Sequence, residues 1–157
     1  MLTYRTVASS ALIASLVVLG ACSQAPMTSS TAVMDSGSSA AMSARLAGAS
    51  EVPPTTSMGS GNLVANFDRQ SNVLTWTVTY AGLSGPVTAA HFHGPAAVGA
   101  NAGVALGLTG SLDSPINGMA TLTAAQTSDL MAGNWYLNLH TAANPNGEIR
   151  GQVSVRR

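Results

Sequence analysis

The chain has 157 residues, of which 8% are charged, and six arginines balance six acidic residues with no lysine present. This composition excludes a basic nucleic-acid-binding surface, because neutralising phosphates requires clustered Lys and Arg side chains. It also disfavours a highly charged disordered chain, and the single cysteine excludes an intrachain disulfide. The length suits one domain preceded by a leader.

The leader comes first in the chain. Arg5 is followed by an apolar run over residues 11–19, which is shorter than the ~20 residues of a membrane-spanning helix and typical of a signal peptide. The run ends in Leu19-Gly20-Ala21-Cys22, which resembles the signal of bacterial lipoproteins. That resemblance implies removal of residues 1–21 and lipidation of the Cys22 thiol. An ordinary secretory signal that ends near a cysteine is the alternative interpretation.

The lipoprotein resemblance also implies a location. Ser23 follows the cysteine, whereas an Asp at this position favours inner-membrane retention in proteobacterial lipoproteins. We therefore expect an envelope protein that its acyl chains anchor in the outer membrane, facing the periplasm or the cell surface. Residues 22–43 are rich in Ser, Thr and Ala and hold one charge, which predicts a flexible linker and places the folded domain at residues 44–157.

Short alternating segments, separated by turns rich in Gly, Pro and Asn, follow the linker. In residues 73–80 apolar side chains alternate with threonines, as in a half-buried strand. Thr123 and Gln126 resemble a capping box and predict one short helix over residues 124–132. The pattern predicts an all-β fold, an antiparallel sandwich or barrel with one short helix, and of these we expect an antiparallel Greek-key β-sandwich. The expected strands are residues 62–67, 73–80, 87–93, 104–108, 118–122, 135–140 and 148–155.

Three histidines, the only ones in the sequence, are the candidate metal ligands. His91 and His93 lie two apart on a predicted strand, so both imidazoles leave the same face. His140 ends another predicted strand, and Asn138 lies two residues before it on the same face. If the two strands are neighbours, three neutral imidazoles converge, a ligand set that suits copper or, less well, zinc and leaves a position for water or substrate. Alternatively, the histidines are structural and hydrogen-bond to loops.

Glu51, Glu148 and Arg150 stand out in a domain with so few charges. Glu148 and Arg150 share one face of a predicted strand, which favours a structural salt bridge that fixes the terminal strand. A functional alternative is an arginine that guides an anion towards the histidines. We treat these three residues and Asn138 as candidates for supporting the metal or for structural roles, and we assign no catalytic residue.

Five segments of the domain form a recognisable series: LAGASEVPP at 46–54, YAGLSGPVTAAHFHGPA at 80–96, LTAAQ at 122–126, LMAGNWYLNLHT at 130–141 and NPNGEIRGQ at 144–152. Together they resemble the CHRD domain, a module named after animal chordin and common in bacterial exported proteins. The resemblance implies a β-sandwich of the immunoglobulin or superoxide-dismutase type. It implies little about activity, because the domain belongs to an extracellular growth-factor antagonist in animals and has a largely undefined role in bacteria.

A more distant likeness is to copper–zinc superoxide dismutase, which has an H-x-H strand, a later copper-ligand histidine and an active-site arginine in the same order as the three histidines and Arg150 here. The lack of a fourth histidine, a zinc loop and a disulfide counts against dismutase activity. We expect first an envelope-anchored binding module with a three-histidine copper site. The second hypothesis is a metal-free domain that binds an envelope protein or a glycan, and the third is a dismutase-like enzyme.

Overall fold

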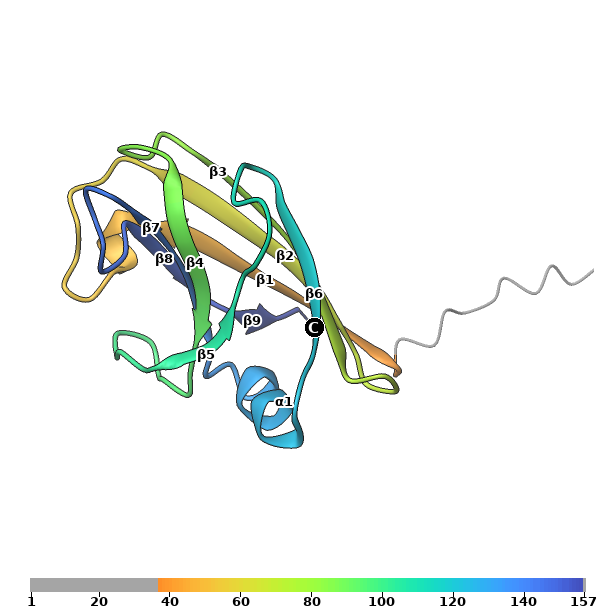
Figure 1. Cartoon of the computed structure of the whole chain (residues 1–157). Coiled ribbons are helices and arrows are strands. Elements are labelled where there is room, and N and C mark those ends of the chain that lie inside the picture. The colour runs from red at the N-terminus through yellow and green to blue at the C-terminus, as the bar shows by residue number, and fades with distance from the viewer. Residues whose placement is uncertain (1–36, 157) are drawn as a thin grey trace, which may run out of the picture. The chain divides into compact units, whose positions relative to one another are not determined.

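The computed structural model describes residues 37–156, in which the chain forms nine β-strands, one α-helix and one 3₁₀ turn (Figure 1). The predicted signal peptide, Cys22 and most of the predicted linker lie outside the described residues. Within the described part of the chain, no helix has the length and apolar character needed to cross a membrane. The elements are β1 (Ser39–Ala47), η1 (Gly48–Ser50), β2 (Ser60–Asp68), β3 (Val73–Ala81), β4 (Val87–His93), β5 (Val104–Gly107), β6 (Ile116–Thr121), α1 (Ala124–Met131), β7 (Tyr136–Thr141), β8 (Ile149–Gln152) and β9 (Ser154–Val155).

The strands form one antiparallel sheet that curls into two layers (Figure 1). The strand order is β5-β4-β7-β8-β1-β2-β3-β6, and β9 pairs with β1. The layer of β5, β4, β7 and β8 joins the other at one register pair, Arg150 with Ala47. The chain crosses between layers after β3, β5 and β6, as connections in Greek-key sandwiches do. The predicted all-β sandwich-like fold with one short helix is confirmed.

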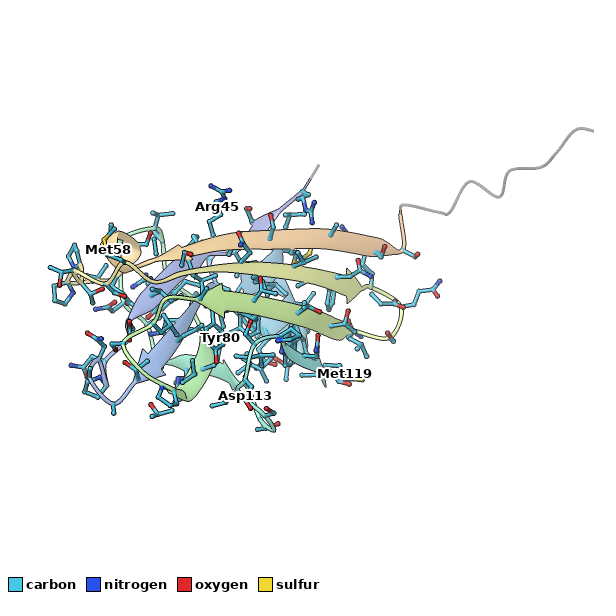
Figure 2. The ribbon with its side chains drawn as sticks, turned by 90° about the horizontal axis from the view of Figure 1, so that it is seen from above. Arg45, Met58, Tyr80, Asp113 and Met119 are labelled. Carbon is cyan, nitrogen blue, oxygen red and sulfur yellow. The ribbon has the colours of Figure 1, made fainter. Side chains whose placement is uncertain are left out.

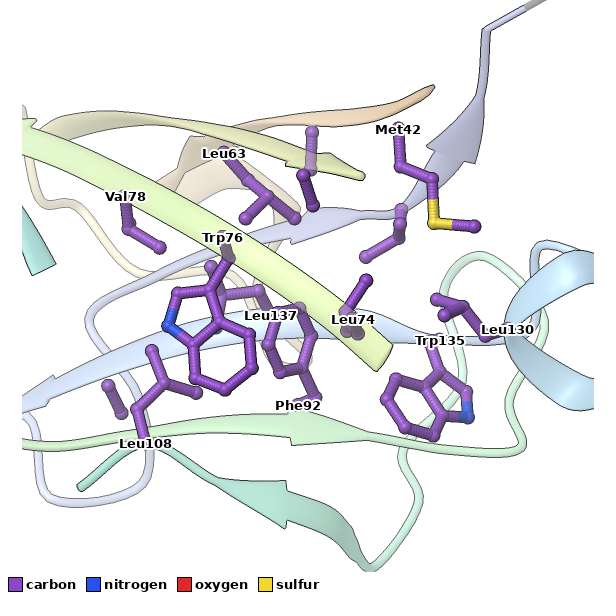
Figure 3. Close-up of a cluster of buried hydrophobic side chains, with 14 of the residues drawn as sticks. Met42, Leu63, Leu74, Trp76, Val78, Phe92, Leu108, Leu130, Trp135 and Leu137 are labelled. Atoms are coloured by element: carbon purple, nitrogen blue, oxygen red, sulfur yellow. The ribbon is translucent and has the colours of Figure 1, made fainter. Parts of the chain in front are cut away.

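The hydrophobic core lies between the two layers. Trp76 of β3 packs edge-on against Phe92 of β4, with ring centroids 5.6 Å apart, and Phe92 contacts Trp135 at 5.8 Å (Figure 3). Leu130 of α1 belongs to the same buried cluster. Burying side chains of this size stabilises a fold by ~1.5–3 kcal/mol each. The core therefore fixes β4 and β7, and with them any side chains on their outer faces.

Every predicted strand but the last is present as one strand, with boundaries shifted by at most two residues. In β3 the alternation is as expected, since Leu74, Trp76 and Val78 are buried and the threonines between them are exposed. Outside the core, side chains such as Met58 and Met119 project into solvent and are 94% and 72% exposed (Figure 2). The helix begins as predicted, because Thr123 Oγ1 accepts from the N–H of Gln126 while the Gln126 side chain accepts from the N–H of Thr123.

The first strand differs from the sequence prediction. β1 begins at Ser39, so the folded part starts five residues before the predicted boundary at residue 44. Ala40, Met42, Ala44 and Leu46 alternate inward and are at most 6% exposed. Alanines and serines dominate this strand, so its sequence resembles that of a Ser/Ala linker. Pairing with β2 along its whole length, and with β8 and β9 on its other side, makes it a strand.

The last predicted strand is divided in two. β8 ends at Gln152 and β9 begins at Ser154, and the backbone N–H of Val153 between them donates to the carbonyl of Trp135. β8 then pairs with β7, whereas β9 pairs with β1. Glu148, placed at the start of that strand by the sequence, precedes β8. Its backbone N–H still donates to the carbonyl of Leu139 on β7, which keeps it next to the layer that carries the histidines.

Candidate metal centre

The three histidines lie on the outer face of the layer formed by β4, β7 and β8. β4 and β7 are antiparallel neighbours, with His91 opposite Asn138 and His93 opposite Tyr136. Because side chains alternate along a strand, Phe92 points into the core and the histidines on either side of it point away. The strand adjacency on which the sequence prediction depended is therefore present.

The ring nitrogens of the histidines converge. Nδ1 of His91 lies 3.1 Å from Nε2 of His140, and the candidate ligand nitrogens of all three residues lie within 4.8 Å of one another. An ion bound at ~2.0–2.1 Å holds two nitrogens ~3.4 Å apart at tetrahedral angles, so the widest pair would have to close by up to ~1.4 Å, a movement within reach of side-chain rotation. His140 is buried, and His91 and His93 are partly exposed, so the group is open to solvent on one side. It can hold a metal ion.

Two backbone carbonyls fix the orientation of the rings. Nδ1 of His93 lies 3.0 Å from the carbonyl oxygen of Ala102, and Nδ1 of His140 lies 2.9 Å from that of Pro145. Because a carbonyl only accepts, both Nδ1 atoms carry the proton, and both Nε2 atoms present a lone pair. Metal-binding histidines in proteins are commonly held in this way, with one nitrogen bonded to the protein and the other free for the ion.

Asn138 adds a further acceptor to the group. Its Oδ1 lies 2.9 Å from Nε2 of His140 and 3.1 Å from Nε2 of His93. Three lone-pair atoms therefore face one another, and His91 can supply only one proton, from Nδ1 to His140. A buried acceptor left without a donor costs ~1–3 kcal/mol. A cation at the centre would satisfy all of them at once.

The imidazoles of His91 and His140 bind a proton less readily than usual, because their pKa values lie below the usual value for histidine. Burial lowers the pKa of His91 most, followed by the neighbouring His140 and His93 rings. Burial also lowers the pKa of His140 most, while the bond to the Pro145 carbonyl raises it and His93 lowers it further. Both rings are neutral at pH 7, the form that ligates metals.

Tyr136 supports His93 from the neighbouring strand. The two rings stack with centroids 4.8 Å apart and an angle of 4° between their planes. The guanidinium carbon of Arg150 lies 3.3 Å from the centroid of the same tyrosine ring. Arg150 also donates to Oδ1 of Asn101 at 2.8 Å and to the carbonyl of Ala100. Arg150 thus ties the loop before β5 to the sheet and holds Tyr136 against the imidazole.

Neither of the two interpretations of Arg150 matches the structure. Arg150 is 2% exposed, so it cannot guide an anion from solvent. It forms no salt bridge with Glu148, whose carboxylate oxygens accept from Ser57, Ser84 and Thr141 instead. Spacing along a strand placed the two charges on one face, but the loops that cover this face supply nearer partners for each.

Glu148 is a structural anchor. Its side chain is fully buried, and its oxygens accept from Ser57 Oγ at 2.7 Å, from the Ser84 N–H at 2.8 Å, and from Ser84 Oγ and Thr141 Oγ1 at 2.5 Å each. Burial raises the pKa of this carboxyl, but the hydrogen bonds outweigh burial and lower it to about 2. Glu148 therefore stays ionised and joins three segments of the chain.

Glu51 lies behind Asn138. It is 6% exposed, and its Oε1 has no hydrogen-bond partner in the described part of the chain. Burial raises the pKa of Glu51 to about 7, although Arg150, the Val52 backbone and the Asn138 side chain lower it. A Cβ on Gly147, whose φ is +124°, would lie 2.4 Å from Oε1 of Glu51 and 2.8 Å from Nδ2 of Asn138. The nitrogen end of the Asn138 amide thus faces Glu51 and Gly147, and its oxygen end faces the histidines.

The sequence analysis gave no role to Tyr136, which lies on the same face of β7 as Asn138 and His140. An aromatic residue two positions before Asn138 on that face was a usable signal. The carbonyls of Ala102 and Pro145 had no signal, because every residue has a carbonyl and only the fold brings these two to the rings.

Comparison with known proteins identifies the family. Residues 42–153 match the model of the CHRD domain. This span covers more than half of the chain and contains the three histidines together with Glu51, Asn138, Glu148 and Arg150. No curated protein and no solved structure matches the chain significantly. The chain belongs to the CHRD domain family.

Proposed function

We propose that this CHRD-domain protein is a metal-binding module of the cell envelope that takes copper through His91, His93 and His140. The observation that carries the proposal is the excess of acceptors at one point. Carbonyls fix two Nε2 atoms as lone-pair donors, and Oδ1 of Asn138 lies within 3.1 Å of both. Among residues 37–156, the neighbouring groups do not supply enough protons to satisfy these atoms, so the arrangement favours a cation.

Copper is the first candidate for two reasons. Imidazole nitrogen suits copper and zinc alike, but among divalent first-row ions copper binds a given nitrogen site most tightly. No thiolate or carboxylate oxygen belongs to the described cluster, which consists of neutral imidazoles beside a neutral amide. Zinc is therefore the second candidate, and it would occupy the same three nitrogens.

The anchoring of the protein is a separate part of the proposal. Leu19-Gly20-Ala21-Cys22 and the apolar run before it support lipidation at Cys22. Acyl chains there would hold the domain at the outer membrane, facing the periplasm or the cell surface. Metabolic labelling with a radioactive fatty acid tests this part, because Cys22→Ser should abolish incorporation of label into the protein.

A copper titration tests the metal site. Residues 23–157, produced without the leader, should take up one equivalent of Cu(II) in competition with a chelator of known affinity. The Cu(II) electron paramagnetic resonance spectrum should show splitting from imidazole nitrogens. His140→Ala should lower the affinity at least 10-fold, since it removes the most buried ligand. Met58→Ala, which removes a fully exposed thioether, is the matched control and should leave uptake unchanged.

Two results would overturn the metal site. One is equal copper uptake by the wild type and by a variant with all three histidines replaced by alanine. The other, which needs no variant and so is independent of folding, is a wild-type spectrum without nitrogen splitting. The better interpretation would then be a metal-free interaction module that binds an envelope protein or a glycan.

A further inference from the structure

Asn138 stands where a ligand of the same ion would stand. We propose that its Oδ1 is the fourth ligand of the site and that this oxygen makes the site prefer Cu(II) to Cu(I). The inference rests on the function proposed above, because it concerns the same ion. It goes beyond that function in naming a ligand that is not a histidine and the oxidation state that the ligand selects.

The distances separate a ligand position from the position of the ion itself. An atom at the centre of the site would lie ~2 Å from each nitrogen, whereas two ligands of one ion lie ~2.9 Å apart at right angles and ~3.4 Å apart at tetrahedral angles. Oδ1 of Asn138 lies 2.9 Å from Nε2 of His140 and 3.1 Å from Nε2 of His93. The pair formed by His91 and His140 has the same spacing, 3.1 Å. The amide oxygen therefore has the spacing of a neighbouring ligand.

The protein fixes which end of the amide faces the histidines. Nδ2 of Asn138 lies against Gly147, and the Asn138 side chain lowers the pKa of Glu51 through a hydrogen bond. A carboxyl oxygen accepts from the amide nitrogen and cannot accept from the amide oxygen. Asn138 is 3% exposed and lies on β7, in the middle of its layer, so it has little freedom to turn. Glu51 is thus a positioning residue for the amide oxygen.

An oxygen ligand changes the selectivity of a histidine site. Cu(I) is a soft ion, whereas an amide oxygen is a hard donor that suits harder, divalent ions. Three imidazoles alone serve both oxidation states of copper. Adding Oδ1 stabilises Cu(II) and does little for Cu(I), so the ratio of the two affinities is the quantity that reports on Asn138.

The test measures both affinities by chelator competition, with Cu(I) handled without oxygen, on residues 23–157. Asn138→Ala should weaken Cu(II) binding by about 10- to 100-fold and change Cu(I) binding by less than about 3-fold. Asn138→Asp keeps an oxygen donor and adds a negative charge, so its Cu(II) affinity should equal or exceed that of the wild type. Glu51→Ala should reproduce part of the effect of Asn138→Ala, while Glu51→Gln, which keeps an acceptor for Nδ2, should restore the wild-type ratio.

The outcomes distinguish this inference from the function on which it rests. A wild type that binds neither ion refutes the copper site itself. A wild type that binds copper while Asn138→Ala leaves the Cu(II) to Cu(I) ratio unchanged refutes only the fourth ligand. Equal weakening of both ions by Asn138→Ala and by Asn138→Asp also refutes it, because that pattern indicates a structural role for the amide. Circular dichroism of each variant checks that the fold is intact.

Discussion

Replacing Glu148 by glutamine should make the domain markedly less stable at neutral pH. The four hydrogen bonds that its oxygens accept come from Ser57, Ser84 and Thr141, and each favours the ionised carboxylate. They lower the pKa of the Glu148 carboxyl in the folded protein to about 2, against 4.5 for a free glutamate side chain. That difference corresponds to about 3 kcal/mol of stability. Glutamine has one acceptor oxygen, so it leaves the Ser84 N–H or a hydroxyl poorly satisfied.

The pH dependence of this contribution has a definite direction. Because the pKa of Glu148 is lower in the folded state, the carboxylate stabilises the fold fully above the unfolded pKa of 4.5. The contribution declines as the pH falls from about 5 and is lost near the folded pKa of about 2. The free energy of unfolding of the wild type should therefore exceed that of Glu148→Gln by about 3 kcal/mol at pH 7 and approach it at pH 2.

Urea unfolding of residues 23–157, followed by tryptophan fluorescence, measures this difference. Trp76 and Trp135 are both buried and report on the core. A chelator in every sample keeps metal out of the comparison. Asp113→Asn is the matched control, because Asp113 is exposed and should change stability by less than about 0.5 kcal/mol. A deficit in Glu148→Gln that stays the same from pH 7 to pH 2 would refute the linkage argument.

Three other substitutions test the rest of the structure by the same unfolding assay. Burial raises the pKa of Glu51 to about 7, so the wild type should lose stability as the pH rises from about 4.5 through 7. Glu51→Gln should then be more stable than the wild type at pH 8, by up to about 3 kcal/mol. A stability difference between the two proteins that does not grow with pH would contradict this. Gly147→Ala should cost more than about 1 kcal/mol, because its Cβ would meet Glu51 Oε1 and Asn138 Nδ2 at a positive φ. Met42→Ala should lower the free energy of unfolding by about 2–5 kcal/mol, because Met42 is fully buried in β1. Met58→Ala is the control and should leave it unchanged, because Met58 is 94% exposed. Equal effects of the two substitutions on stability would mean that β1 is not part of the core.

The sequence predicted most of the fold because strong local patterns and the tertiary structure agree. In β3 large apolar residues alternate with threonines, and in α1 the capping box of Thr123 and Gln126 marks the start of the helix. β1 escaped prediction because alanine and serine give little contrast between its two faces. Its inward alanines are buried because the sheet that β1 forms with β2 packs this face on the core, and those contacts are not visible locally.

The candidate site was predicted in part. His91, His93 and His140 were correctly brought together, since strand alternation fixes which way the side chains point and the pairing of β4 with β7 does the rest. The role of Arg150 was not predictable from spacing, because its partners come from the loop at residues 100–101, and no local rule places that loop over the sheet. Tertiary contacts thus decide the surroundings of a site even where the sequence identifies its centre.

The cost of the polar cluster outside β7 is itself an argument for function. Glu51 and Arg150 are at most 6% exposed, one oxygen of Glu51 has no partner in the described chain, and Asn138 Oδ1 faces two lone pairs. Buried charges often contribute less to stability than apolar residues of the same size would. If this face of the layer had only a structural role, apolar side chains under the loops would make the fold more stable. Local arrangements that lower stability are expected at functional sites, and here they surround the point where three imidazoles converge.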